Sequence, residues 1–177
     1  KGPRSGVLAL WDEMTSVRPI VGIAGLDAHA QRLVGLTAFP YEFLFRTLRT
    51  HVLCCPPTGN SADDVAAVLD SIRLGHVYFS NDLYWSPKGF AFSASVGGKD
   101  YLQGDVITDS GKIRLSVSLP DDAAIRVLRD GELWTCMEGR SWEDETSQHG
   151  VYRVEVSRES QPWIFSNPIY FRNIPFI

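Results

Sequence analysis

The chain has 177 residues, of which 44% are hydrophobic and 21% are charged, and its formal net charge is -4. This composition is typical of globular proteins and excludes the disordered class, which is poor in hydrophobic residues. Lys and Arg are scattered along the sequence, which argues against a nucleic-acid partner, and no run of about 20 apolar residues is present that could span a membrane.

The sequence contains three cysteines, Cys54, Cys55 and Cys136. A secreted disulfide framework normally has an even number of cysteines at wider spacing. We therefore predict reduced, partly buried thiols and a cytoplasmic location. The sequence begins at Lys1 with neither Met nor an apolar signal segment, so we expect it to start inside a longer protein.

The first part of the chain alternates helix-like and strand-like patterns. Apolar residues at helical spacing predict a helix over residues 7–17, which Pro19 ends. The apolar run over 20–26, rich in β-branched residues, predicts a strand covered on both faces. A second apolar stripe, with proline in its first turn, predicts a helix over 40–53.

A third helix is predicted over 62–74, with Ser61 as its N-cap and Gly75 just past its end. The segment HVYFS, residues 76–80, predicts one more short strand. Helices that alternate with buried strands are typical of α/β proteins. The sequence therefore predicts an α/β unit over residues 1–83.

From residue 84 onward the pattern changes to short segments of alternating hydrophobicity, namely GFAFSASV, KIRLSVSL, AIRVLRD, ELWTCM, GVYRVEV and WIFSNPIYF. Several short strands separated by Gly, Pro and Asp indicate an antiparallel sandwich or barrel. We predict an antiparallel immunoglobulin-like β-sandwich over residues 84–177, a boundary within 82–88, and an α+β fold class for the whole chain.

Two local motifs support the sandwich. Asp130 and Gly131 can both adopt the positive φ angles that a tight hairpin requires. Gly150, Tyr152 and Val154 follow the spacing of the tyrosine corner of immunoglobulin-like domains, with Val154 at the place of the disulfide cysteine.

The strand predicted over 20–26 leads directly into Asp27 and His29. A carboxylate and a neutral imidazole are both good ligands for Zn, Mn or Fe. Their i, i+2 spacing places both side chains on one side of an extended segment, so one ion or two adjacent ions could contact both. From the two residues alone, a capping role for Asp27 and a structural role for His29 are the alternatives.

The surroundings of this pair resemble a known family. The segments LWDEM, VGIAGLDAHA, FPYEFLFRTLRTHVL and DDVAAVLDSIRLGHVYFS are similar to the last third of the PHP (polymerase and histidinol phosphatase) family of metal-dependent phosphoesterases. Members of that family commonly end their barrel with a strand that carries G-S-D-A-H, where this chain has Leu26 in place of the small residue. The later β segments resemble a small β-sandwich that is appended to a subset of the family.

The resemblance implies both a fold and an activity. Residues 1–83 would be the C-terminal fragment of a PHP-type β/α barrel, and 84–177 its appended β-sandwich. Asp27 and His29 would be metal ligands in a cluster of up to three divalent ions (Zn, Mn or Fe) in the intact parent. The reaction would be the hydrolysis of a phosphate-ester substrate by metal-activated water.

The same resemblance leaves part of the site outside this chain. The family also needs an early H-x-H and further ligands, and a complete barrel needs about 200 or more residues. We therefore expect the missing N-terminal barrel portion to be the partner that completes the site, and this chain alone to be inactive and to exchange any bound ion with the buffer. The catalytic residues themselves are not identified. The alternative is a non-catalytic β-sandwich that acts as a binding or assembly module.

Other candidate residues have ordinary structural explanations. His51 is expected in a core or at a helix end, His76 near a helix C-terminus, and His149 at the surface. The tryptophans Trp85, Trp142 and Trp163 would form either a sugar-binding or partner-binding face or, as is more usual, part of the core.

Overall fold

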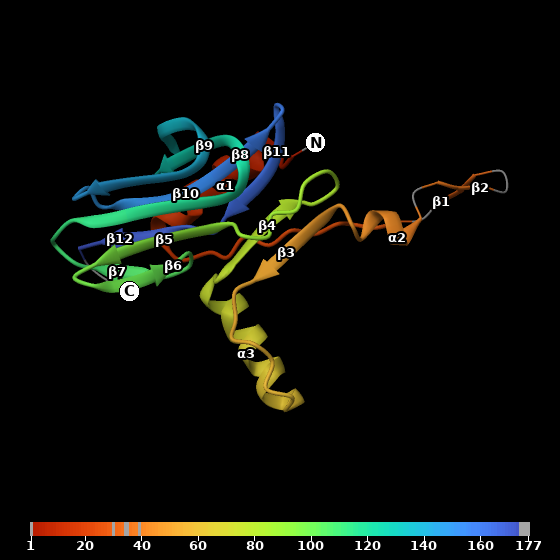
Figure 1. Ribbon diagram of the computed structural model, residues 1–177, viewed down its shortest axis with the longest axis horizontal. Helices are drawn as coiled ribbons and strands as arrows, with labels where there is room; N and C mark the ends of the chain where they lie inside the picture. The colour runs from red at the N-terminus through yellow and green to blue at the C-terminus, as the bar shows by residue number, and fades with distance from the viewer. Residues whose placement is uncertain (1, 30, 34–35, 39, 174–177) are drawn as a thin grey trace.

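The computed structural model describes residues 2–29, 31–33, 36–38 and 40–173 of the chain. Most of the described residues belong to one antiparallel, curled sheet with few helices (Figure 1). The elements in chain order are α1 (Ser5–Val17), β1 (Gln31–Leu33), β2 (Leu36–Ala38), α2 (Tyr41–Leu44), β3 (Leu48–Val52), α3 (Ser61–Leu74), β4 (Val77–Asn81), β5 (Ala91–Val96), β6 (Lys99–Leu102), β7 (Val106–Thr108), β8 (Ile113–Arg129), β9 (Glu132–Thr146), β10 (Gly150–Arg158), β11 (Gln161–Ser166) and β12 (Ile169–Arg172).

The large sheet has ten strands, in the order β3-β4-β11-β10-β8-β5-β6, with β9 beside β8 and with β12 beside β10 and β7. Its pairs are antiparallel except β12 with β7. On one side, β8 pairs with β9. On the other side, the first half of β8 pairs with β5 and the second half with β10. The ladder shifts between Ser118 and Ala123, and this break lets the sheet fold over on itself.

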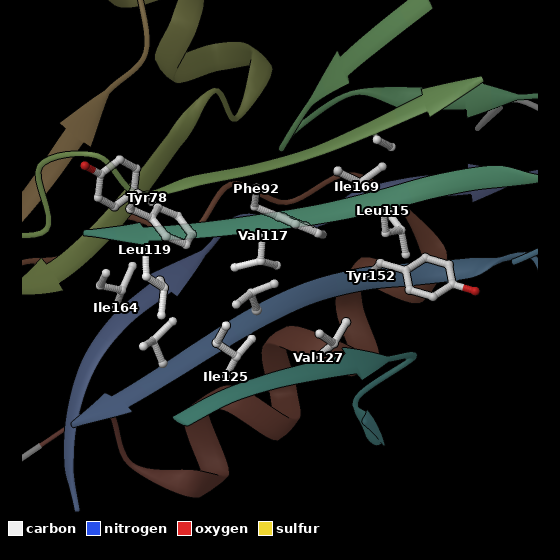
Figure 2. Close-up of a cluster of buried hydrophobic side chains, with 14 of the residues drawn as sticks. Tyr78, Phe92, Leu115, Val117, Leu119, Ile125, Val127, Tyr152, Ile164 and Ile169 are labelled. Atoms are coloured by element: carbon white, nitrogen blue, oxygen red, sulfur yellow. The ribbon is translucent and has the colours of Figure 1, made fainter. Parts of the chain in front are cut away.

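The folded sheet encloses the hydrophobic core. Buried residues alternate along β8, as expected for a strand with one face turned inward. Figure 2 shows Leu115 and Val117 of β8 packed with residues from β5, β10 and β11. Each large apolar side chain that is removed from water contributes about 1.5–3 kcal/mol. The antiparallel, sandwich-like part of the predicted fold class is therefore confirmed.

The local motifs of this part are also confirmed. Asp130 and Gly131 have φ angles of 53° and 82° in the turn between β8 and β9. The Tyr152 hydroxyl donates a hydrogen bond to the Gln148 carbonyl at 2.5 Å, and both Tyr152 and Val154 are fully buried. This is the geometry of a tyrosine corner.

In the first part of the chain, two helices and a strand follow the prediction. The helix predicted over 7–17 is α1, and the strand predicted over 76–80 is β4. The helix predicted over 62–74 is α3, but its N-cap is Asn60 rather than Ser61. Gly75 follows α3 in the left-handed conformation. In Figure 1, α3 projects away from the sheet.

Two of the predicted elements are wrong. Residues 40–53 do not form one helix: α2 covers only Tyr41–Leu44, and Leu48–Val52 form strand β3. Pairing with β4 satisfies one edge of β3, and this tertiary contact outweighs the helical apolar spacing. Residues 20–26 are not part of a strand ladder, and their backbone is held by side chains instead.

The predicted PHP-type barrel portion over 1–83 and the division from 84–177 stay predictions. β3 and β4 belong to the first of these parts, yet they pair antiparallel with each other and β4 continues the large sheet through β11. The connection between β4 and β5 contains the predicted boundary over 82–88.

Candidate functional site

The segment that leads to Asp27 and His29 is fastened by side chains from distant parts of the sequence. Ile20 accepts a hydrogen bond from the Trp11 indole nitrogen at 3.0 Å, and its N–H donates to the Tyr170 hydroxyl at 3.2 Å. Gly22 donates to Asn167 Oδ1 at 2.7 Å and accepts from Asn167 Nδ2 at 2.8 Å. A side-chain amide therefore does for Gly22 what a neighbouring strand would do in a sheet.

Ala24 is held in the same way by β3. Its N–H donates to Thr50 Oγ1 at 3.0 Å, and its carbonyl accepts from the same hydroxyl at 3.5 Å. Beyond Ala24 the exposure alternates, so that Gly25, Asp27 and His29 are exposed while Leu26 and Ala28 are half-buried. Asp27 and His29 are therefore both exposed, but the positive φ angle of Asp27 interrupts the extended segment on which they were predicted to lie.

The backbone changes direction at Asp27, whose φ angle is 48°. Non-glycine residues rarely adopt this left-handed conformation, although Asp tolerates it better than most. Asp130, Glu159 and Ser160 have similar φ angles in the hairpin turns after β8 and β10, so at Asp27 this conformation indicates a turn.

His29 folds back on Asp27. Its Nδ1 lies 2.8 Å from the Asp27 carbonyl oxygen and 3.4 Å from Asp27 Oδ1. Two oxygen acceptors at Nδ1 favour the tautomer with its hydrogen on that nitrogen, which leaves Nε2 with a free lone pair. The side chains of Asp27 and His29 are 92% and 72% exposed, so both are open to a ligand from solvent.

These donors fit a divalent metal ion in part. A histidine ligand commonly donates its second ring N–H to a carbonyl or carboxylate, as the Nδ1 of His29 does here. Zn, Mn and Fe all accept carboxylate and imidazole ligands together. Within the described ranges, however, no group of three or more His, Cys, Asp or Glu side chains is placed to hold an ion. The pair can supply two ligands, and a firmly bound ion needs more.

A large apolar groove of about 620 Å³ lies on the α1 side of the sheet. It is lined mainly by residues 2–14 at and around α1, by residues 21–25, and by sheet residues that include Phe79 and Phe165. Neither Asp27 nor His29 is among its lining residues.

A buried polar cluster was missed because residues 48–52 were predicted to be helical. His51 Nε2 lies 2.7 Å from Ser80 Oγ, the Ser80 hydroxyl donates to Asp82, and the His51 ring stacks on Tyr78. Burial and the nearby Asp82 carboxylate raise the pKa of Tyr78 to about 12. His51 and Ser80 are 29 residues apart in the sequence, so no local sequence pattern indicated that they are in contact.

The cluster contains Ser, His and Asp but does not have the geometry of a nucleophilic triad. Asp82 approaches the same His51 nitrogen that faces Ser80, at 3.5 Å, instead of the opposite ring nitrogen. Ser80 is also fully buried, so its hydroxyl is not accessible to a substrate. The cluster links β3 to β4 and to the turn after it.

The remaining histidines have structural contacts. His76 Nε2 lies 2.8 Å from Asp105 Oδ1, beyond the C-terminal end of α3. His149 is half-buried rather than exposed as predicted, with Nε2 3.0 Å from the Asp109 carbonyl oxygen and its ring against Phe171.

The tryptophans and cysteines also have defined positions. Trp163 is fully buried in the hydrophobic core, and Trp85 and Trp142 are partly buried against that core. These positions agree with the core interpretation. The cysteines are unpaired but all exposed, so the predicted partial burial is wrong.

Within the described residues, no helix combines the length and the apolar character needed to cross a bilayer. A scan against protein-family models finds no match, and searches of curated proteins and of solved structures find none either.

Proposed function

We propose that this chain supplies two metal ligands, Asp27 and His29, to a divalent-metal-dependent phosphoesterase of the PHP kind. The observation that carries the proposal is the His29 ring, whose Nδ1 is engaged by Asp27 oxygens while Nε2 and the Asp27 carboxylate are open to solvent. The remaining ligands would come from polypeptide outside the 177 residues. Zn, Mn and Fe are the ions that this donor pair fits.

Each residue has a distinct task in this proposal. Asp27 offers an anionic oxygen ligand, and its Oδ1 lies 3.4 Å from the Nδ1 of His29. His29 offers a neutral nitrogen, and its contact with the Asp27 carbonyl fixes the tautomer and the ring orientation. Bound divalent ions would lower the pKa of water and offset the charge on the phosphoryl oxygens.

The proposal is testable in the 177-residue chain. Mn²⁺ added to isotopically labelled protein should broaden the amide signals of residues 26–29 first, because a paramagnetic ion relaxes nearby nuclei even when it exchanges rapidly. Asp27→Asn and His29→Gln should each remove this broadening. His149→Gln is the control, because a ring nitrogen of His149 also contacts a backbone carbonyl while the residue lies outside the Asp27–His29 pair. Broadening that centres elsewhere and is unchanged by the two variants would reject the metal-ligand assignment.

The phosphoesterase part needs a longer protein. The chain alone should show negligible hydrolysis of a generic phosphate ester, since two ligands do not hold an ion cluster. A protein that includes the polypeptide encoded upstream of Lys1 should hydrolyse the ester, and Asp27→Asn or His29→Gln should lower both its metal content and its turnover. Full activity in both variants would reject the proposal, as would chelator-sensitive activity of the short chain.

A second candidate is a non-catalytic assembly module. It is favoured by α3, which projects from the sheet and exposes Val65, Val68 and Leu69, an i, i+3, i+4 stripe, to 57%, 38% and 44% (Figure 1). An amphipathic stripe of this kind commonly packs against another helix. The Mn²⁺ experiment separates the candidates, because an assembly module has no need of ions at Asp27 and His29.

A further inference from the structure

In residues 20–25, the backbone groups of every second residue are hydrogen-bonded. Both the N–H and the C=O of Ile20, Gly22 and Ala24 are bonded to side chains. In an extended chain, the N–H and C=O of one residue point to one side and those of the next residue to the other. The even-numbered groups therefore face the sheet, and the odd-numbered groups face away from it.

The outward groups form an open strand edge. No hydrogen bond to the backbone of Val21, Ile23 or Gly25 is found within the part of the chain that the structure describes. An extended backbone with unpaired donors and acceptors is a template on which another strand can pair. We call this feature, residues 21–25, the open edge.

Apolar surface accompanies the open edge. The groove of about 620 Å³ is bounded by residues 21–25 and by Val7, Leu10 and Met14 of α1. The side chains of Val7, Leu10 and Ile23 are 60%, 55% and 63% exposed. A strand that pairs with the open edge would have apolar surface beside it to accept its alternate side chains.

We propose that the open edge accepts an extended, apolar peptide strand from a polypeptide other than this chain. The free N–H and C=O groups recur at every second residue, about 6.6 Å apart, which is the repeat of a β-strand. A helix satisfies its own backbone and cannot use these groups, and a small molecule rarely carries donors and acceptors at this repeat. The partner is therefore a β-strand, with apolar residues at alternate positions.

This surface is separate from the metal-ligand pair. The open edge depends on backbone hydrogen bonds and does not require Asp27 or His29 to bind an ion. A strand that pairs in parallel would end next to Asp27 and His29, since these follow the open edge directly, and this consequence alone rests on the proposed function. The readouts below are backbone amides, so the two proposals can fail independently.

The first experiment measures amide hydrogen exchange in the chain alone. The amides of Gly22 and Ala24 are bonded to Asn167 and Thr50, so they should exchange about tenfold or more slowly than those of Ile23 and Gly25. Equal protection of both sets, unchanged by dilution, would mean that the chain itself already covers the open edge, and would overturn the proposal.

The second experiment adds a probe peptide of seven residues, with valine at alternate positions and lysine or threonine between them. Its titration should shift and protect the amides of Val21, Ile23 and Gly25. The same peptide with proline in place of its central valine is the control, and should have no effect. Absence of any shift with the first peptide, or an equal effect of both, would reject strand addition.

A pair of variants tests the backbone directly. Ile23→Pro removes a free N–H that the fold does not use, while the bonds of Gly22 and Ala24 remain. It should preserve the near-ultraviolet spectrum and abolish the response to the peptide, whereas Ile23→Val should keep that response. A second copy of the chain is the competing partner: protection of Ile23 that rises with protein concentration, together with a dimer in sedimentation, would overturn the proposal in favour of self-pairing.

Discussion

Strand β8 and the segment 20–25 are both extended, but their backbones are satisfied in different ways. β8 is bonded to β9 on one side and to β5 and β10 on the other, through ladders of many residues. The segment 20–25 depends on four side chains, those of Trp11, Thr50, Asn167 and Tyr170. A ladder tolerates the loss of one contact because its neighbours hold the register. A segment held by single side chains should fail when one of them is removed.

The largest effect is expected at the ion network that fastens α1 to the sheet. Arg153 is 3% exposed, donates to both Asp12 carboxylate oxygens at 2.5 and 2.7 Å, and donates to Glu155 at 2.6 Å. Burial alone would lower the pKa of Arg153, but the hydrogen bonds to Asp12 and Glu155 outweigh it and raise that pKa. Arg153→Met should lower the free energy of unfolding by about 3–5 kcal/mol, because Asp12 is left buried without its partner. Urea denaturation measures this loss.

Two comparisons sharpen that prediction. Arg114→Met removes an exposed partner of Glu145 within the β8–β9 ladder and should have a much smaller effect. Asp12→Leu combined with Arg153→Met should recover part of the loss, since Glu155 keeps Arg126 at 2.8 Å. A double variant as unstable as Arg153→Met alone would show that the cost is not an unpaired carboxylate.

The next effect is expected at Asn167, which bonds Gly22 and also donates to the Val77 carbonyl at 2.8 Å. Asn167→Ala leaves these backbone groups unsatisfied and should lower the free energy of unfolding by about 3 kcal/mol. The same substitution at Asn60, the exposed N-cap of α3, should cost about 1 kcal/mol. If both substitutions lower the free energy of unfolding by the same amount, the bonds from Asn167 to Gly22 and Val77 do not stabilise the fold as the structure indicates.

A third prediction concerns alkaline pH. Burial is the main cause that raises the pKa of Tyr78 and of Tyr170 to about 12, from an ordinary value of 10. The folded state therefore keeps the phenolic proton that the unfolded chain releases. Stability should be unaffected below pH 10 and should fall between pH 10 and 12, by about 2–3 kcal/mol for each residue.

Tyr78→Phe isolates this effect at a residue whose ring packs in the core. The variant should lose less stability than the wild type between pH 10 and 12 in denaturation measurements, and exposed Tyr84→Phe should behave as the wild type does. An unchanged alkaline slope in Tyr78→Phe would contradict the expected titration.

The comparison also explains what could be predicted from sequence. The hairpin at Asp130-Gly131 and the corner at Tyr152 depend on residues a few positions apart, so their chemistry is visible locally. β3 was assigned to a helix because its partner β4 lies about 30 residues away, and the apolar spacing of residues 40–53 suits both forms. Long-range pairing decided the outcome there.

In the candidate site, too, only the local features could be predicted from the sequence. Asp27 and His29 are both exposed, but the i, i+2 rule of an extended strand does not account for it, because Asp27 has a left-handed backbone. The clamp by Asn167 joins positions 145 residues apart and has no local signature. The segment 20–26 is extended as its composition indicates, but a strand also requires a neighbour, and no composition of one segment specifies where that neighbour lies.

The smallest effect is expected at Asp27 itself, and its sign matters more than its size. With a φ of 48°, Asp27 occupies a conformation that glycine adopts without steric cost. Asp27→Gly relieves the left-handed strain but gives the unfolded chain more freedom, so the free energy of unfolding should stay nearly unchanged while the carboxylate is removed. If Asp27 instead caps the turn that follows, the substitution should cost a few tenths of a kcal/mol and Asp27→Ala about 1 kcal/mol. Thermal denaturation of both variants, together with Mn²⁺ broadening at His29, distinguishes the two roles. If Asp27→Gly abolishes the Mn²⁺ broadening without lowering stability, Asp27 is a metal ligand. If the substitutions only lower stability and the broadening remains, Asp27 is a capping residue.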